Sequence, residues 1–306
     1  MPPKLRINHE LKPLKLLKLP NNLLMIWISN VIIRFLYSVN RPVNGVKQER
    51  LTFVMRDGYK LKVDMFVPLA KKSNSSILYF PGGGFMMSGT HIHKRSLSSI
   101  AKELGQVAFL VHYRLAPKYP FPIALYDAYD SLVYLRKHAH NFFIHRDKIG
   151  IGGDSAGGNL CAAMSLYLQD QKQPYPLYQM LLYPALDDGK ESESRKKYTA
   201  TPMLRTSMLV FIYKVLFKNG YQNLEKYAYP CLHPHIEKQP PTYIEILEFD
   251  PLHDDGIKYQ EILLKTNTEV VLKDISGAVH GYDAMFQTDI VQKSLNARIE
   301  FIRKHS

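Results

Sequence analysis

The sequence predicts an α/β protein with a mostly parallel central sheet and helices on both of its faces. Short apolar runs alternate with longer segments of helical periodicity from about residue 75 onward. The runs are nearly continuous in apolar residues, which is typical of parallel strands buried on both faces. The chain has 306 residues, enough for a large core, and α/β folds of this size often form one domain.

The first elements of the sheet are predicted as a hairpin. Residues 51–56 and 59–67 alternate between apolar and polar side chains with a period of two. Asp57 and Gly58 stand between them, and Asp-Gly is a strong signal for a tight hairpin turn. We therefore expect two antiparallel strands at one edge of the sheet.

The rest of the sheet and its covering helices follow in alternation. Buried strands are predicted at 77–80, 107–112, 148–152, 179–183, 243–249 and 269–275. Helices are predicted at 91–104, 122–139, 156–170, 254–266 and 283–304.

One segment interrupts this alternation. Residues 189–226 begin polar, then become apolar with helical spacing, and contain no strand pattern. Together with residues 1–48 they are expected to form a small helical cap over the carboxyl edge of the sheet, where open α/β sheets bind ligands. The prediction is a single domain, 1–306, with its catalytic core in 50–188 and 227–304.

Residues 23–39 are predicted to form a helix near the amino end. Its apolar face is expected to dock on the protein's own body and carries Leu24, Trp27, Ile28, Val31 and Phe35.

A membrane role for this segment is the alternative interpretation. Asn30 and Arg34 interrupt it, so stable insertion across a bilayer is not expected. The residues that follow it fit a signal-peptide cleavage site poorly. Weak peripheral contact with anionic lipid, helped by Lys12, Lys15 and Lys18, is left open.

The charge and cysteine content narrow the function classes further. Lys and Arg number 40 against 27 Asp and Glu, giving a net charge of +13, and residues 1–48 hold eight of the bases and one acid. No nucleic-acid motif accompanies this excess, so a nucleic-acid partner is not predicted. Two cysteines, Cys161 and Cys231, cannot build a disulfide framework or a four-cysteine zinc site, which favours a cytoplasmic location.

The sharpest motif is Gly153-Asp154-Ser155-Ala156-Gly157, which matches G-x-S-x-G. A predicted strand precedes it and a helix rich in small residues follows, as a nucleophile elbow requires. The helix amino terminus after Ser155 offers backbone N–H groups to a developing oxyanion.

A second motif, Pro81-Gly82-Gly83-Gly84-Phe85, directly follows another predicted strand. Successive glycines expose backbone N–H groups to a ligand without side-chain interference. No Gly-Lys-Ser or Gly-Lys-Thr sequence follows, which argues against a phosphate-binding loop.

Two further polar positions lie after late strands. Asp250 follows the strand predicted at 243–249, and His280 follows the last predicted strand. The chain order Ser155, Asp250, His280 is that of a serine hydrolase triad on an α/β sheet. Asp254 and Asp255 are the other candidates for the acid.

These motifs resemble those of the hormone-sensitive-lipase-like branch of the α/β-hydrolase fold, the bacterial esterase and acetylesterase group. The resemblance spans residues 50–304 and rests on four blocks, at 81–85, 112–122, 153–160 and 250–256 with 280–281. It implies that Ser155 is the nucleophile, His280 the general base and Asp250 the acid that orients it. It also implies an oxyanion hole formed by the N–H groups of Gly83, Gly84 and Ala156.

One position departs from the family pattern. The family usually has histidine before the three glycines, where this chain has Pro81. Proline fixes its own φ and restricts the preceding residue, so we interpret Pro81 as a substitute brace for the loop. A weakened or non-catalytic member is the rival interpretation.

The predicted function is a serine carboxylester hydrolase that acts on short-chain acyl esters through an acyl-enzyme, with no metal or organic cofactor. Residues 85–87 and 203–217 are expected to supply its apolar pocket. An amidase or peptidase on the same triad, and a non-catalytic binding member of the fold, are the alternatives. The expected partner is a small-molecule ester, and a homodimer is left open.

Overall fold

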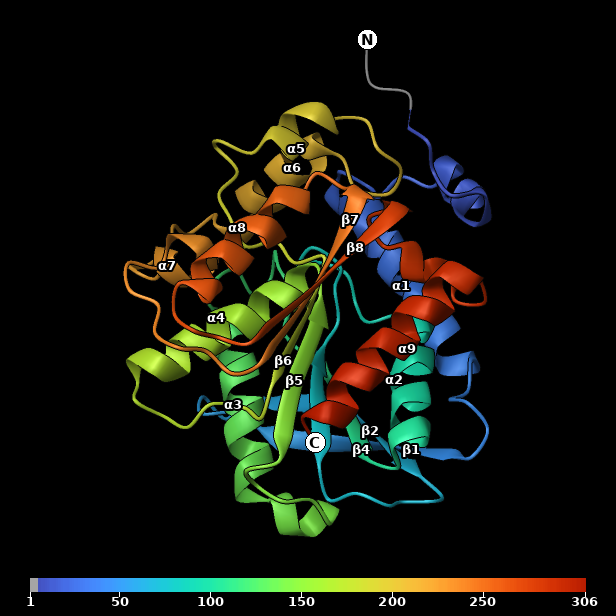
Figure 1. Ribbon diagram of the computed structural model, residues 1–306, viewed down its shortest axis with the longest axis vertical. Coiled ribbons are helices and arrows are strands. Elements are labelled where there is room, and N and C mark those ends of the chain that lie inside the picture. The colour runs from blue at the N-terminus through green and yellow to red at the C-terminus, as the bar shows by residue number, and fades with distance from the viewer. Residues whose placement is uncertain (1–4) are drawn as a thin grey trace.

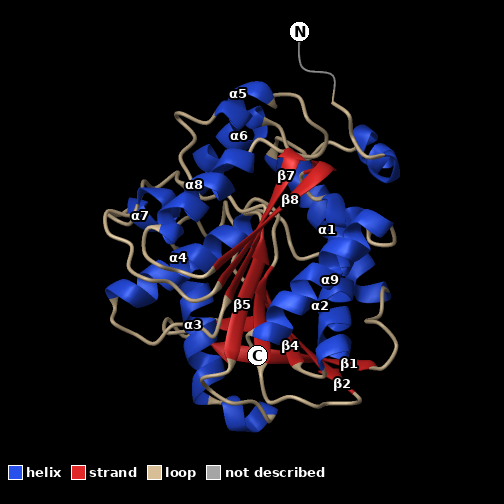
Figure 2. Cartoon of the chain, viewed as in Figure 1, coloured by secondary structure: helices blue, strands red, loops and turns tan. Residues whose placement is uncertain are grey.

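The computed structural model describes residues 5–306, so the first four residues of the predicted cap segment 1–48 lie outside the described part. Within it, one eight-stranded sheet has the order β1-β2-β4-β3-β5-β6-β7-β8 (Figures 1 and 2). Strand β2 is antiparallel to β1 and β4, and the pairs from β4 through β8 are parallel. The predicted fold class is confirmed. The strands are β1 (Val46–Val54), β2 (Lys60–Pro68), β3 (Ser76–Phe80), β4 (Val107–His112), β5 (Ile149–Asp154), β6 (Gln179–Leu182), β7 (Thr242–Phe249) and β8 (Val270–Val279).

The predicted hairpin is present, but its first strand starts earlier than expected. Strand β1 begins at Val46, five residues before the alternating pattern. Strand β1 lies at the edge of the sheet, and its opening residues are mostly exposed and polar. An exposed edge strand needs no apolar alternation, so its start left no signal. The boundary between the amino-terminal segment and the sheet therefore falls at Val46 rather than near residue 50.

Helices cover the sheet on both faces, as Figure 2 shows. The helices are α1 (Leu23–Val39), α2 (His91–Leu104), α3 (Ile123–Lys137), α4 (Ala156–Asp170), α5 (Glu193–Lys197), α6 (Thr206–Leu216), α7 (Glu225–Ala228), α8 (His253–Leu264) and α9 (Asp289–Lys304), with 3-10 turns η1 (His9–Leu16), η2 (Ala139–Phe142), η3 (Pro230–Leu232) and η4 (Tyr282–Met285). The single helix predicted at 283–304 is in fact η4 followed by α9, which begins after the N-cap residue Thr288.

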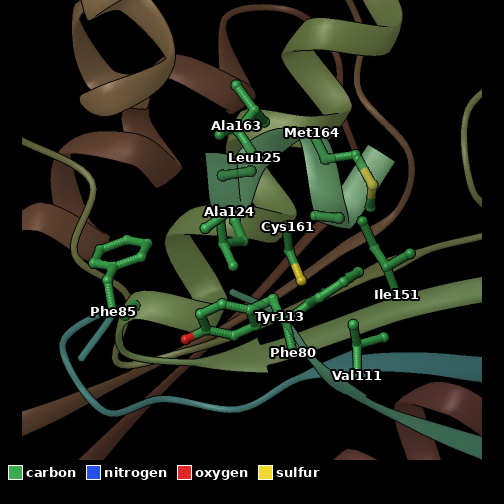
Figure 3. Close-up of a cluster of buried hydrophobic side chains, with 14 of the residues drawn as sticks. Phe80, Phe85, Val111, Tyr113, Ala124, Leu125, Ile151, Cys161, Ala163 and Met164 are labelled. Carbon is green, nitrogen blue, oxygen red and sulfur yellow. The ribbon is translucent and has the colours of Figure 1, made fainter. Parts of the chain in front are cut away.

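Two apolar clusters, one on each face of the sheet, hold these layers together. The larger cluster joins the strands to α3, α4 and α8, and the other joins them to α2 and α9. Figure 3 shows Phe80, Val111 and Ile151, which come from β3, β4 and β5, gathered near Cys161 of α4. Each such side chain contributes roughly 1.5–3 kcal/mol to the stability of the fold when it is buried. The loops that follow β3 and β5 are therefore attached to a well-packed core.

The predicted orientation of helix α1 is wrong. The face expected to dock, which includes Trp27, Val31 and Phe35, is exposed to solvent. The helix instead packs through Ile26 and Tyr37, which are buried. The helix's own residues are apolar around most of its circumference. The spacing of apolar residues in the sequence therefore could not identify which face packs against the rest of the protein. No helix within residues 5–306 is long and apolar enough to cross a membrane.

Between β6 and β7 the chain leaves the sheet and forms α5, α6 and α7, in the segment predicted as part of a cap. The amino-terminal segment meets it through backbone hydrogen bonds. The Met203 N–H donates to the Leu17 carbonyl over 2.9 Å, and the Leu19 N–H donates to the Met203 carbonyl over 3.1 Å. Segments nearly 200 residues apart in sequence thus form one layer at the end of the sheet.

Candidate active site

The turn between β5 and α4 forces Ser155 into an unusual backbone conformation, with φ of 54° and ψ of −116°. Non-glycine residues rarely adopt such angles, and the strain persists only where neighbouring packing enforces it. Gly153 and Gly157 make the turn possible, because a Cβ on Gly153 would collide with the backbone of Gly157, and a Cβ on Gly157 with the carbonyl of Phe80. The predicted strand–turn–helix context is therefore present.

Ser155, His280 and Asp250 lie in one chain of hydrogen bonds. The Nε2 atom of His280 is 2.9 Å from the Oγ of Ser155, and its Nδ1 is 2.7 Å from an Oδ of Asp250. With the proton on Nδ1, the ring donates to Asp250 and accepts from Ser155. The other oxygen of Asp250 accepts the Leu252 N–H over 2.9 Å, which fixes the orientation of the carboxylate.

The other two candidate acids are engaged elsewhere. Asp255 pairs with Arg195 over 2.8 Å and accepts the backbone N–H groups of Leu186 and Asp187. Asp254 accepts the N–H of Ser194 over 2.7 Å. Both anchor the segment that contains α5, and neither hydrogen-bonds His280.

The glycine loop after β3 contains the other predicted site residues. Gly83 and Gly84 have φ of +126° and +59°, a region that disfavours side chains. Within residues 5–306, the N–H groups of Gly83, Gly84 and Ala156 donate to no acceptor, although neighbouring backbone groups do. These three groups, from the loop and from the first residue of α4, are free to bind an incoming oxygen atom.

Asp154, the residue before the serine, holds this loop in position. Its Oδ1 accepts the Gly82 N–H over 3.0 Å and the Tyr79 hydroxyl over 2.9 Å, and lies 3.0 Å from Nε2 of His93. A further bond comes from the hydroxyl of Tyr113, which donates to the Pro81 carbonyl over 2.7 Å. The loop is thus braced at two successive residues, Pro81 and Gly82.

His93 and Asp154 favour each other's charged form as well as forming a hydrogen bond. Burial lowers the pKa of His93, but the nearby Asp154 carboxylate outweighs burial, and the net pKa is raised. Burial raises the pKa of Asp154, but the charge and hydrogen bond of His93, with the Gly82 N–H, bring its net pKa below the usual value. The pair therefore favours an imidazolium and a carboxylate, whose attraction strengthens in a buried site.

A cavity of about 340 Å³ opens on Ser155 and His280, at the lower end of the usual range for ligand pockets. Its apolar wall comes from the glycine loop and from the two segments predicted to form a cap. The wall includes Ile33 and Leu36 of α1, Phe85 and Met87 of the loop, and Met208, Leu209 and Ile212 around α6. Phe85 and Met87 line this cavity as predicted, whereas Met86 does not.

Helix α6 touches the glycine loop itself. A Cβ placed on Gly84 would lie 2.8 Å from Cδ1 of Ile212, so this side chain covers the loop closely. Asn159 of α4 donates to the carbonyls of Ala185, which follows β6, and of Ala228 in α7. These bonds connect the helix after Ser155 with the segment between β6 and β7.

Sequence reasoning missed the brace around the glycine loop. Asp154 stood within the recognised motif, but nothing in the sequence connects it with Gly82. His93 lies in the first turn of α2, where its Nδ1 is 2.9 Å from both the backbone nitrogen and the hydroxyl of Thr90. The neutral ring accepts the Thr90 N–H there, whereas the imidazolium donates to the hydroxyl. Its sequence signal is that of an ordinary capping residue, because its second partner is 61 residues away.

Comparison with known proteins gives the family. A family model described as alpha/beta hydrolase fold matches residues 77–284, so the chain belongs to this family. An ethyl acetate hydrolase of Pseudomonas putida is 28% identical over 239 residues, covering 77% of this chain and 75% of that protein. An esterase, LipI, of Mycobacterium tuberculosis is 30% identical, covering 67% and 65%.

The similarity extends to the whole structure. A solved structure titled bacterial heroin esterase superimposes with a TM-score of 0.89 at 27% identity and covers 98% of each chain. The predicted resemblance to the esterases of the α/β-hydrolase fold is confirmed, as is the predicted enzyme class, a hydrolase of carboxylic esters.

Proposed function

We propose that this protein hydrolyses short-chain carboxylic esters with Ser155 as nucleophile, His280 as general base and Asp250 as the group that orients His280. The observation that carries the proposal is the Ser155–His280–Asp250 chain, with distances of 2.9 and 2.7 Å, at the base of an apolar cavity. Nucleophile and base within hydrogen-bond reach, with the base oriented by a third group, is the arrangement that activates a serine.

In the first step, the Oγ of Ser155 attacks the ester carbonyl carbon while Nε2 of His280 accepts the hydroxyl proton. The resulting imidazolium is stabilised by the Asp250 carboxylate and then gives its proton to the departing alcohol. The acyl group stays on Ser155. In the second step, water gives a proton to His280 and attacks the acyl carbon, and the acid leaves as Ser155 regains its proton.

The N–H groups of Gly83, Gly84 and Ala156 form the oxyanion hole in this proposal. Their lack of other acceptors within residues 5–306 supports the assignment, because donors held ready need no reorganisation when charge develops. The dipole of α4, whose first residue is Ala156, adds to the stabilisation. Asp154 holds the loop and His93 holds Asp154, so both act as positioning residues that do not bond the reacting atoms.

The cap determines acyl size in this proposal. Residues 5–48 and 189–226 contribute Ile33, Leu36 and Ile212 to the cavity wall, and a cavity of about 340 Å³ fits a small ester. We also propose a reducing, cytoplasmic location, which the two free and buried cysteines support.

A series of p-nitrophenyl esters from acetate to laurate tests the proposal. The wild type should hydrolyse acetate and butyrate well and lose kcat/KM steadily with longer chains. Ile212→Ala should enlarge the cavity and move the preferred chain towards longer acyl groups. Val210→Ala is the matched control, because Val210 lies on the same helix but is exposed. No hydrolysis of any ester by folded protein would contradict the proposal.

A further inference from the structure

Helix α1 presents a large apolar surface that nothing in the described structure covers. Trp27, Val31 and Phe35 are 64%, 52% and 63% exposed, and they recur at spacings of four residues along one side of the helix. The face continues through other exposed apolar residues, Leu24, Ile28, Ile32 and Val39. Contiguous apolar patches of this kind mark surfaces that bind a partner or a membrane.

The opposite side of the same helix is firmly attached to the protein. The side chain of Asn30 donates to the Met86 carbonyl over 2.9 Å and accepts the Ser88 N–H over 2.8 Å. Tyr37 is buried and donates to Asp64. The exposed apolar face is therefore held in a fixed orientation by contacts to the glycine loop and the sheet.

The segment that leads into this helix is positively charged. Lys12, Lys15 and Lys18 precede the helix, are exposed, and form no ion pair with an acid within residues 5–306. Glu10 is the single acid of residues 1–48, and it pairs with none of these lysines. Its carboxylate instead accepts the N–H groups of Asp289 and Ile290 at the start of α9.

The cavity beside the helix has the same character. It measures about 1000 Å³ and is lined in part by Trp27, Arg34 and Lys62. Arg34 and Lys62 make hydrogen bonds to hydroxyl groups rather than to acids. Basic groups therefore lie both before the helix and along its flank.

We propose that α1 is an interfacial helix that binds the protein peripherally to an anionic phospholipid surface. Aromatic and aliphatic side chains on one face, bordered by lysine and arginine, are the features of helices that lie in the plane of a bilayer surface. Trp27 and Phe35 would enter the boundary between headgroups and acyl chains, and the lysines would contact lipid phosphates. Asn30 and Arg34 interrupt the apolar sequence of the helix, which suits it to lying on the surface rather than crossing it.

Charge favours a membrane over a second copy of this chain. A symmetric dimer through this face would bring two identical basic surfaces together, and like charges facing one another oppose association. An anionic lipid surface attracts the same charges.

Trp27 is the only tryptophan of the chain, so its fluorescence reports directly on this face. The test uses full-length protein with vesicles of phosphatidylcholine alone or mixed with phosphatidylglycerol. We expect flotation with the mixed vesicles, a blue shift of Trp27 emission, and quenching by lipids brominated in their acyl chains. Vesicles of phosphatidylcholine alone should bind much less, and added salt should weaken binding.

Two variants that keep the tryptophan sharpen the test. Val31→Glu/Phe35→Glu should lose at least tenfold in vesicle affinity, and Lys12→Glu/Lys15→Glu/Lys18→Glu should lose the preference for phosphatidylglycerol. The matched control is Val133→Glu/Leu264→Glu, which adds the same charge at exposed apolar positions of α3 and α8 and should bind as the wild type does. Circular dichroism and the thermal midpoint establish that each variant is folded.

Three results would overturn the proposal. One is failure of the folded wild type to bind the mixed vesicles. Another is equal binding by wild type and Val31→Glu/Phe35→Glu. The third is a blue shift without vesicles that grows with protein concentration alongside a sedimenting dimer, which would assign the face to a second copy of the chain.

Discussion

The two loops that meet at the candidate site are held in different ways. The turn around Ser155 is specified locally, by Gly153 and Gly157 and by the strand and helix on either side of it. The glycine loop at 82–84 is held by groups distant in sequence, chiefly Asp154 and Tyr113. Asp154 links the two, because it is part of the turn and binds the loop.

This difference explains why the two loops should respond differently to mutation. Chemistry depends on one atom of the turn, the Ser155 Oγ, so its loss removes the covalent step. The loop contributes backbone N–H groups, which side-chain changes leave in place and only proline would remove. Side-chain changes there act only by displacing donors, so their effects should be smaller and graded.

The largest effect is expected for Ser155→Ala. Without the nucleophile, kcat for p-nitrophenyl acetate should fall by about 10⁶-fold, as it does when serine hydrolases lose this group. Stopped assays at high enzyme concentration measure the residual activity. The circular dichroism spectrum of the variant should match that of the wild type. Turnover above a few percent of wild type would mean that Ser155 is not the nucleophile.

Asp154→Ala tests the link between turn and loop. Removing the carboxylate leaves Gly82 and His93 without their acceptor, so the loop donors should shift and kcat should fall by about 10²-fold with little change in KM. Steady-state kinetics separate the two constants.

The matched control for that variant is Asp170→Ala. Asp170 likewise has three hydrogen-bond partners, the side chains of Lys226, Tyr227 and His233, at the far end of α4. It should lower the thermal midpoint and leave kcat within a few-fold. Equal loss of kcat in both variants would assign Asp154 a purely structural role.

Pro81→His restores the residue that is usual in the family. Because Gly82 and the Pro81 carbonyl are already held by Asp154 and Tyr113, the new side chain should change kcat by less than about tenfold. Losing the fixed φ should cost about 0.4–1 kcal/mol of stability, measured by urea unfolding. A rise in kcat of two orders of magnitude would instead mean that the present loop is defective.

The smallest expected effect is the pH dependence of the stability that His93 contributes. The pKa of His93 is raised by Asp154 in the folded protein, so its stabilisation is full below the unfolded pKa of about 6.5 and is lost as pH rises through the folded value. The stability difference between wild type and His93→Gln should therefore be largest near pH 6 and shrink towards pH 9. Urea titrations across this range measure it. A difference that grows with pH would rule out the charged pair.

The sequence predicted features encoded by neighbouring residues and missed those that depend on distant contacts. The strand–turn–helix around Ser155 and the order of strands and helices follow local patterns. The brace by His93 could not be predicted, since its partner is 61 residues away. The docking face of α1 was assigned wrongly because Ile26 and Ile33 are as apolar as Trp27 and Val31, and only tertiary contacts choose between them.

Covalent labelling is the most direct test of whether Ser155 is an activated nucleophile. A fluorophosphonate reacts only with serines that a neighbouring base activates, and mass spectrometry of the digested protein locates the adduct. We predict rapid, stoichiometric labelling of Ser155, which is lost in His280→Ala although the serine is retained. Folded wild-type protein that is unlabelled, or labelled at another serine, would contradict it.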